Sequence, residues 1–470
     1  MSESRGRYLA KNTIIFTIGD FGSKVISFLL VPLYTNVLST EEYGNGDLIT
    51  TLCGVLAPIL ILNISESVMR FQLDKDANKN DVFRIGLRIL IISIFLGIII
   101  IPLYTLIKPI KNYWLYMYFY NVSIGASTLF LYDLRGKEKL LKYSIGGILM
   151  TLSAALLNIL FLVVMHLRLR GYILAYIFAN VITTIYCVVA GGSLKDYRRG
   201  RIDREKMKEM IRFSVVLIPN TFMWWIMNSS DRLMIATMVS SAQAGIYAIS
   251  YKLPTLVSTL TGIFNQAWGY SAIHEHGSTD ESEYNNKVFV ALISFAMLMG
   301  IGMLTIMKPF LRVYVEQSFY EAWKYTPFLV IGCVYLTMGT FISTTYNVHK
   351  DSMGFLISAT IGATTNVALN FLLIPQFEVY GAAIATCISY VVVFVFRYFH
   401  TRKYIVFNIK NKEFILGSIF LLTSSALMYV ESIFGLVLQI LVLILSCILY
   451  SNVWLTICKR VLNRLKTLRR

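Results

Sequence analysis

The stretch GKEKLLKYSIGGILMTLSAALLNILFLVVMHLRLRGYILAYIFANVI, residues 136–182, holds two apolar runs separated by a short polar turn. Each run approaches the ~20 residues that an α-helix needs to cross the hydrocarbon core of a bilayer. A second stretch, NVHKDSMGFLISATIGATTNVALNFLLIPQFEVYGAAIATCISYVV at residues 347–392, repeats the order of a small-residue helix, a short turn and a glycine, Gly381 matching Gly171. The two stretches predict paired membrane helices in two related halves of the chain.

The composition of the whole chain also indicates a membrane protein. Its 470 residues are 56% hydrophobic and only 15% charged, whereas a soluble chain is roughly a quarter charged. We therefore expect an all-α polytopic membrane protein with fourteen transmembrane helices. The expected spans are 12–38, 46–69, 83–107, 112–134, 143–166, 171–192, 212–238, 245–272, 286–311, 322–346, 354–375, 379–400, 409–430 and 433–457.

The net charge of +17 follows the membrane topology. If the amino terminus is cytoplasmic, 33 of the 43 lysines and arginines fall in inner segments and seven in outer loops. Basic residues gather on the cytoplasmic side of membrane proteins. This bias predicts that both termini are cytoplasmic, and it explains the positive charge without a nucleic-acid partner.

The basic segment KDYRRGRIDREKMKEMIR, residues 195–212, divides the first twelve spans into two sets of six. VLSTEEYGNGDLITTL after the first span parallels MVSSAQAGIYAISYKL after the seventh, and this aligns Gly44 with Gly245. Such a parallel repeat is typical of transporters whose two halves rock around a central cavity. The expected parts are a six-helix lobe at 1–192, a linker at 193–211, a second lobe at 212–400, and two extra helices with a basic tail at 401–470.

Charged side chains inside the spans are candidates for function, because ionisable groups in a membrane are costly and normally face a cavity or a partner. Asp20 and Lys24 lie one turn apart in the first span. Asp231 and Arg232 precede the outer end of the seventh span, and Lys252 enters the eighth at a similar depth. These groups are either ion pairs that hold helices together, Asp231 with Lys252 among them, or the lining of a hydrated cavity.

In the cavity interpretation, Lys24, Arg232 and Lys252 contact phosphate, and arginine offers the better bidentate geometry. Asp20 and Asp231 modulate that charge or take up a coupling ion. Glu66, near the inner end of the second span with Arg70 one turn on, completes an inner cluster with Asp20 and Lys24.

Neutral polar and aromatic residues offer glycan contacts or, as the commoner role, contacts between helices. These candidates are Asn63, Asn220, Asn228, Gln266 and Trp268. The chain has no Gly-rich phosphate loop, nucleophile elbow or metal-ligand pair on one helix, so we expect no enzyme, no metal site and no cofactor. Coupling to H⁺, Na⁺ or the membrane potential stays open.

Two segments carry a family resemblance. LAKNTIIFTIGDFGSKVISFLLVPLYTNVLSTEEYGNGDLI, residues 9–49, and NSSDRLMIATMVSSAQAGIYAISYKLP, residues 228–254, resemble polysaccharide-transport flippases of the Wzx type. These flippases belong to the superfamily of the lipid II flippase and the multidrug extrusion (MATE) transporters.

The resemblance implies two six-helix lobes around a central cavity and an undecaprenyl-diphosphate-linked oligosaccharide as substrate, for O-antigen, capsule or another surface polysaccharide. It implies a bacterial cytoplasmic membrane, with a polysaccharide polymerase and a chain-length regulator as partners. It also implies cationic diphosphate contacts in the first, second and eighth spans. Lys24 and Lys252 match these places, whereas the second span offers only Arg70 at its inner edge.

Two other functions fit parts of the sequence. A drug or cation antiporter on the same scaffold would need a net excess of carboxylates in its cavity, and the three cations inside the spans argue against it. A polysaccharide ligase or a non-transporting membrane scaffold is a different class. The short outer loops disfavour the ligase, and a hydrated crevice between the lobes would disfavour the scaffold.

Overall fold

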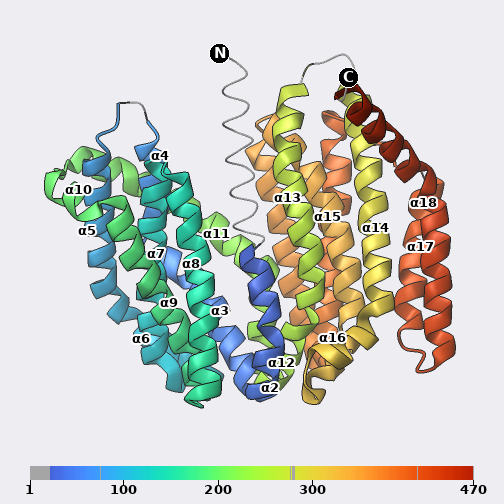
Figure 1. Cartoon of the computed structure of the whole chain (residues 1–470), viewed down its shortest axis with the longest axis horizontal. Helices are drawn as coiled ribbons and strands as arrows, with labels where there is room; N and C mark the ends of the chain where they lie inside the picture. Colours follow the sequence, from blue (N-terminus) through green and yellow to red (C-terminus); the bar gives the residue numbers. More distant parts are fainter. Residues whose placement is uncertain (1–21, 75, 276, 278–280, 410, 469–470) are drawn as a thin grey trace. The chain divides into compact units, whose positions relative to one another are not determined.

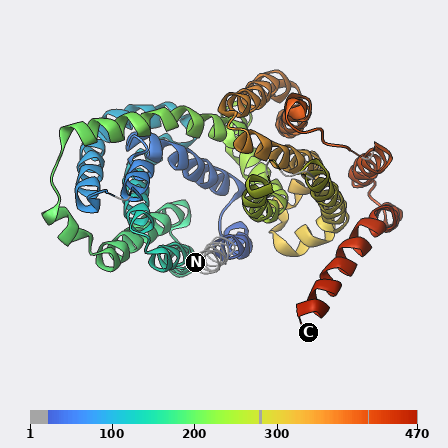
Figure 2. The same cartoon turned by 90° about the horizontal axis from the view of Figure 1, so that it is seen from above.

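The computed structural model describes residues 22–74, 76–275, 277, 281–409 and 411–468 (Figure 1). These residues form helices joined by short loops, and no strand occurs among them. The chain divides into two compact units between Gly245 and Ile246. Within each unit most of the long helices run side by side and many are seen end-on in the turned view, whereas the long helix Arg204–Met238 runs across that view (Figure 2).

The first unit begins with short helices and ends with a long one that carries the basic segment. Its helices are α2 (Val31–Val37), α3 (Thr40–Leu60), α4 (Ile64–Gln72), α5 (Lys79–Gly97), α6 (Ile101–Leu106), α7 (Trp114–Gly136), α8 (Leu140–Asn158), α9 (Arg168–Gly191), α10 (Ser193–Arg199), α11 (Arg204–Met238) and the start of α12 (Ser241–Ser250). Because α11 packs against α3 and α4, the seventh predicted span lies in this unit. The lobe boundaries expected from the sequence stay a prediction.

The second unit holds the longest helices. They are α13 (Lys252–Glu275), α14 (Glu281–Tyr314), α15 (Thr326–Val348), α16 (Ser352–His400), α17 (Asn411–Leu427) and α18 (Ile433–Leu468), with a 3₁₀ segment at Gln317–Lys324. Helix α14 packs against both α17 and α18.

Among the described residues, six helices are long and apolar enough to cross a membrane, or up to eight if two bent pairs count as single spans. The chain is therefore a multi-pass helical membrane protein, and the count of fourteen stays a prediction. Part of the difference lies in α16, which joins two expected spans across a kink at Glu378 (φ 49°). There a Cβ on Gly381 would lie 2.4 Å from the carbonyl oxygen of Leu373, so only glycine lets the chain return so closely.

The second expected span is broken rather than continuous. Leu62 and Asn63 both have positive φ, and α3 and α4 meet there at a bend of 58°. The side-chain amide of Asn63 donates to Thr221 Oγ1 of α11 at 3.1 Å, and the backbone carbonyl of Asn63 accepts from Ser214 Oγ at 3.4 Å. Helix α11 therefore fixes the break in place.

Candidate functional site

A line of polar contacts joins α3 to α11. Nη1 of Arg232 donates to Asp47 Oδ2 at 2.9 Å and to Thr51 Oγ1 at 3.2 Å. The carbonyl of Thr51 accepts from the indole N–H of Trp225 at 3.2 Å. Asp47 and Thr51 are one turn apart on α3, and Trp225 and Arg232 are about two turns apart on α11. The two helices therefore meet along matching faces.

The Asp47–Arg232 pair is largely shielded from solvent. Its side chains are 10% and 17% exposed, respectively. Removing two charges from water is costly, and such a pair persists only when each charge compensates the other and further hydrogen bonds are made. Thr51 supplies one of these bonds. The pair is thus a compensated charge site within the first unit.

Asp231, the neighbour of Arg232, is buried. Its Oδ1 accepts the backbone N–H of Arg232 at 2.9 Å. Asp231 lies in the first unit and Lys252 in the second, so the expected bridge between them stays a prediction. Both residues have interaction partners in the structure.

Asp47 is the site residue that the sequence reasoning missed. It stands inside the expected second span, within the segment YGNGDLI. It is only the second residue of that expected span, 46–69, so the rule that selected Asp231, a carboxylate well within an apolar span, did not select Asp47. The position of Arg232 on the seventh span was predicted, whereas its carboxylate partner was not.

The predicted inner cluster is only partly described. Asp20 lies outside the described residues, and Lys24 is exposed on a helical turn. Arg70 is paired with Asp74 at 2.5 Å, one turn farther on, with both side chains about half exposed. Glu66, which is half-buried, interacts with Tyr132 of α7. The structure therefore joins Arg70 to Asp74, and its role toward phosphate stays a prediction.

The glycan candidates fall in different surroundings. Trp268 is buried and stacks on Phe341, with ring centroids 4.8 Å apart, which is the packing alternative. Asn228 is half-buried and has an interaction partner. The side chains of Asn220 and Gln266 lie outside the description. Asn63 holds the break in the second span, so it already has a structural role.

A second network that the sequence did not reveal holds α7, α10 and α4 together. Lys137 Nζ donates to Asp133 Oδ2 at 2.6 Å and to Asp196 Oδ2 at 2.5 Å, and Gln72 Nε2 donates to Asp133 Oδ1 at 2.7 Å. Asp133 is fully buried, and three neighbours donate to it, Ser193 being the third. Because these charges satisfy one another, the network is best explained as structural.

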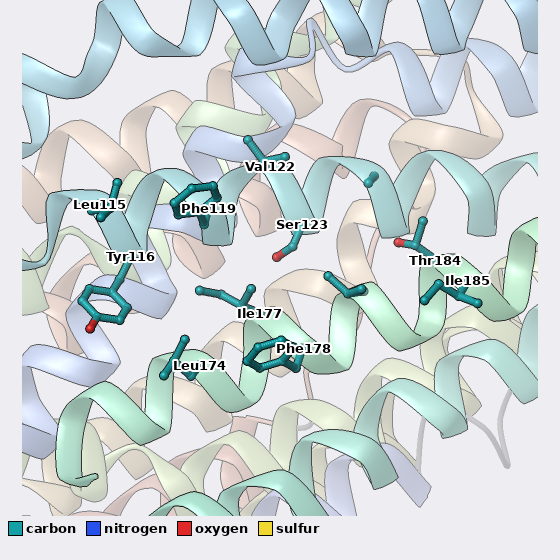
Figure 3. Close-up of a pocket in the computed structure, with 12 residues that line it drawn as sticks. Leu115, Tyr116, Phe119, Val122, Ser123, Leu174, Ile177, Phe178, Thr184 and Ile185 are labelled. Carbon is teal, nitrogen blue, oxygen red and sulfur yellow. The ribbon is translucent and has the colours of Figure 1, made fainter.

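An apolar pocket of about 520 Å³ lies between α7 and α9 (Figure 3). Three of its labelled side chains carry a hydroxyl, Tyr116, Ser123 and Thr184, and the last two each donate to a carbonyl of their own helix at 2.8 Å. The donor hydrogens of Ser123 and Thr184 are thus already used, and the remaining wall is almost entirely apolar, so a polar glycan would find few partners here. This pocket is therefore unsuited to sugar recognition. Among the described residues, no three His, Cys, Asp or Glu side chains are placed to hold a metal ion.

The apolar helices, the broken second span and the charge pair held between helices define a polytopic membrane protein with a transporter-like fold. A family model described as "Polysaccharide biosynthesis protein" matches residues 9–268, which is more than half of the chain. The chain therefore belongs to the polysaccharide biosynthesis protein family. No curated protein sequence matches it.

Solved structures share the fold at low sequence identity. The lipid II flippase MurJ in an inward closed conformation is 14% identical, with a TM-score of 0.69 over 94% of this chain and 98% of that one. An inward-facing MATE multidrug resistance transporter is 14% identical, with a TM-score of 0.65 over 81% and 94%. A transporter of the same superfamily from Pyrococcus furiosus is 14% identical, with a TM-score of 0.56 over 84% and 94%. The family match confirms the resemblance stated from the sequence, and these structures show that the fold is shared.

Proposed function

We propose that this protein is a flippase that moves an undecaprenyl-diphosphate-linked oligosaccharide from the inner to the outer leaflet of a bacterial cytoplasmic membrane. A glycan and two phosphates cannot cross about 30 Å of hydrocarbon unaided, because burying unpaired polar and charged groups is prohibitive. A hydrated cavity that opens to each side in turn removes most of that barrier. Membership of the polysaccharide biosynthesis family and the flippase-like fold support this function.

The observation that carries the proposal is the Asp47–Arg232 pair. A guanidinium binds a carboxylate and a phosphate with the same planar fork of donors. Asp47 therefore acts as a resting counter-ion, and an arriving diphosphate competes with it for Arg232. Lys24 and Lys252 are further cationic contacts in this proposal, and Arg70 receives the head group at the inner edge.

The direction and energy of transport belong to the same proposal. Both termini are cytoplasmic, so the substrate enters from the side that carries most of the basic residues. Asp20, Asp231 and Glu66 are the groups that respond to H⁺, Na⁺ or the membrane potential. A polysaccharide polymerase and a chain-length regulator act on the glycan after it has crossed.

Complementation tests this function. In a bacterial strain that lacks its own glycan flippase, the intact chain is expected to restore surface polysaccharide. Lys24→Ala and Arg232→Ala are each expected to lower it about tenfold or more, the size of one lost charge-assisted hydrogen bond. Lys111→Ala, which removes an exposed charge in the 3₁₀ segment Lys108–Tyr113, is the matched control, and membrane levels of every variant are measured by immunoblot.

Normal export by both alanine variants would contradict the assignment of these cations. A second candidate function, drug or cation antiport, is favoured by the fold shared with the MATE transporter. Drug resistance conferred by the chain, without restored polysaccharide in any strain tested, would support the antiporter and reject the flippase.

A further inference from the structure

A pocket of about 530 Å³ lies in the second unit, between the carboxy-terminal end of α14 and the loop that joins α17 to α18. Two cations of α14, Lys308 and Arg312, line one side of it. Apolar side chains from the α17–α18 hairpin, Leu427 and Ile433 among them, line the other side. Glu431, Ser432 and Gln439 also line the hairpin side, so the two cations of α14 face a wall that is mostly but not wholly apolar. None of the pocket residues belongs to the proposed transport site.

The two cations are held in place by aromatic residues. They are one turn apart, so both project from the same face of α14. The Lys308 ammonium lies 3.8 Å from the centroid of the Trp323 ring, a cation–π contact. Arg312 Nε donates to the hydroxyl of Tyr320 at 3.2 Å. These contacts orient the side chains and leave most of their N–H donors available.

Neither cation forms an ion pair with a described carboxylate, although Glu431 attracts Lys308 from a longer distance. Within the described part of the chain, neither Lys308 nor Arg312 has an oxygen of Asp or Glu within 4.0 Å. The hairpin beside them is fastened by other contacts. Tyr429 donates its hydroxyl to the carbonyl of Lys324, and Gln439 Nε2 donates to the carbonyl of Ser424 at 2.9 Å. The cations are therefore not required to hold the hairpin in place.

The surroundings of the pocket are those of a membrane interface. Val313 is 89% exposed and Ile433 is 83% exposed, and Ile306 on α14 is also exposed. Aliphatic side chains this exposed at the end of an apolar span face lipid tails. Trp323 and Tyr320 are the residue types that mark the level of lipid head groups. A lipid bound here would place its head group beside the cations and its acyl chains against the exposed aliphatic side chains.

The charges select the class of head group. Glu431 also lines the pocket, so Lys308, Arg312 and Glu431 together give a net charge of +1. This balance suits one negative charge better than the several charges of a diphosphate. Free phosphate has no hydrocarbon tail, so it could not bury the apolar side chains of the hairpin.

From this arrangement we infer that the pocket binds the phosphodiester head group of an anionic glycerophospholipid. Lys308 and Arg312 contact the phosphate oxygens, and the acyl chains lie against the α17–α18 hairpin. Under the proposed orientation this is the outer leaflet. Basic pockets between membrane helices recognise anionic head groups in this way.

Native mass spectrometry of the purified full-length protein tests the inference. The probes are phosphatidylglycerol and, as the lipid without net charge, phosphatidylcholine. The intact chain is expected to retain phosphatidylglycerol in preference to phosphatidylcholine. Arg312→Gln and Lys308→Gln are each expected to weaken that retention about tenfold, which corresponds to one charge-assisted hydrogen bond.

Two further variants separate binding from folding. Glu431→Gln removes a negative charge that repels the lipid phosphate, so it is expected to strengthen phosphatidylglycerol retention. A misfolded protein would not show such a gain. Lys324→Gln is the matched control, because Lys324 lies outside the pocket lining and is paired with Glu321 at 2.7 Å. It is expected to leave retention unchanged.

The inference is overturned if Arg312→Gln and Lys308→Gln lose no more lipid than Lys324→Gln does. It is also overturned if millimolar inorganic phosphate displaces phosphatidylglycerol completely, since the pocket would then recognise phosphate without a tail. Neither result bears on glycan export, because complementation reports on Lys24 and Arg232 alone.

Discussion

Replacing Gly44 with alanine is expected to lower the free energy of unfolding by about 3 kcal/mol, the upper part of the usual range for overpacking. A Cβ at this position would lie 1.9 Å from the carbonyl oxygen of Ser241 and 2.7 Å from the backbone N of Gly245. Both obstacles are backbone atoms, which no rotamer change can move aside. Helices α3 and α12 would have to separate, and the contacts around them would be lost.

The same helix offers a matched control. Gly54 also lies on α3, and a Cβ there would meet nothing within 4 Å. Gly54→Ala is expected to raise stability by about 0.5–1 kcal/mol, because alanine loses less backbone entropy in a helix. Thermal denaturation of both variants in detergent measures the difference in their stabilities. Equal stabilities would show that the close approach of α3 and α12 is not tight in solution.

Gly44 and Gly245, the two glycines aligned by the repeat, contact each other in the structure. A Cβ on Gly245 would lie 2.2 Å from the carbonyl oxygen of Thr40 and 3.0 Å from the backbone N of Gly44. The sequence aligned these two glycines as equivalent positions, and the structure brings them into contact. Alignment alone could not predict this contact, because it says which positions are equivalent and not whether they meet.

The helices were predictable where the apolar pattern is uniform. The expected spans 143–166 and 171–192 match the helical stretches Leu140–Val164 and Arg168–Gly191 within a few residues. The expected span 46–69 instead contains the break at Leu62 and Asn63. Hydropathy does not report φ, so the apolar pattern alone does not predict a left-handed turn, although Asn63 is of a residue type enriched at positive φ.

The candidate site was predictable only one side chain at a time. Arg232 can be identified because it is a charge inside a span. Burying a cation in a membrane is costly, so such a residue normally faces a partner or a cavity. Its partner depends on how α3 and α11 face each other, which is a long-range property. The sequence placed Arg70 in an inner cluster with Glu66, Asp20 and Lys24. The structure shows the ion pair of Arg70 with Asp74, which a flexible side chain at an exposed helix end reaches easily.

Removing one member of the Asp47–Arg232 pair is expected to have the largest effect on stability. Arg232→Gln leaves Asp47 with only about a tenth of its side chain exposed and no opposite charge beside it. Breaking a buried pair from one side costs about 3–5 kcal/mol, because the remaining charge is uncompensated. Asp47→Asn is expected to cost less, because Arg232 keeps its hydrogen bond to Thr51 and has a further interaction partner.

The double variant Asp47→Asn with Arg232→Gln separates stability from transport. Two neutral amides leave no orphaned charge, so we expect it to recover most of the lost unfolding free energy. If Arg232 contacts the diphosphate, glycan export stays low although the protein is stable again. Thermal unfolding of all four proteins together with complementation of export provides both readouts. Export that recovers in step with stability would mean that the pair only joins α3 to α11, and the phosphate contact would have to be assigned elsewhere.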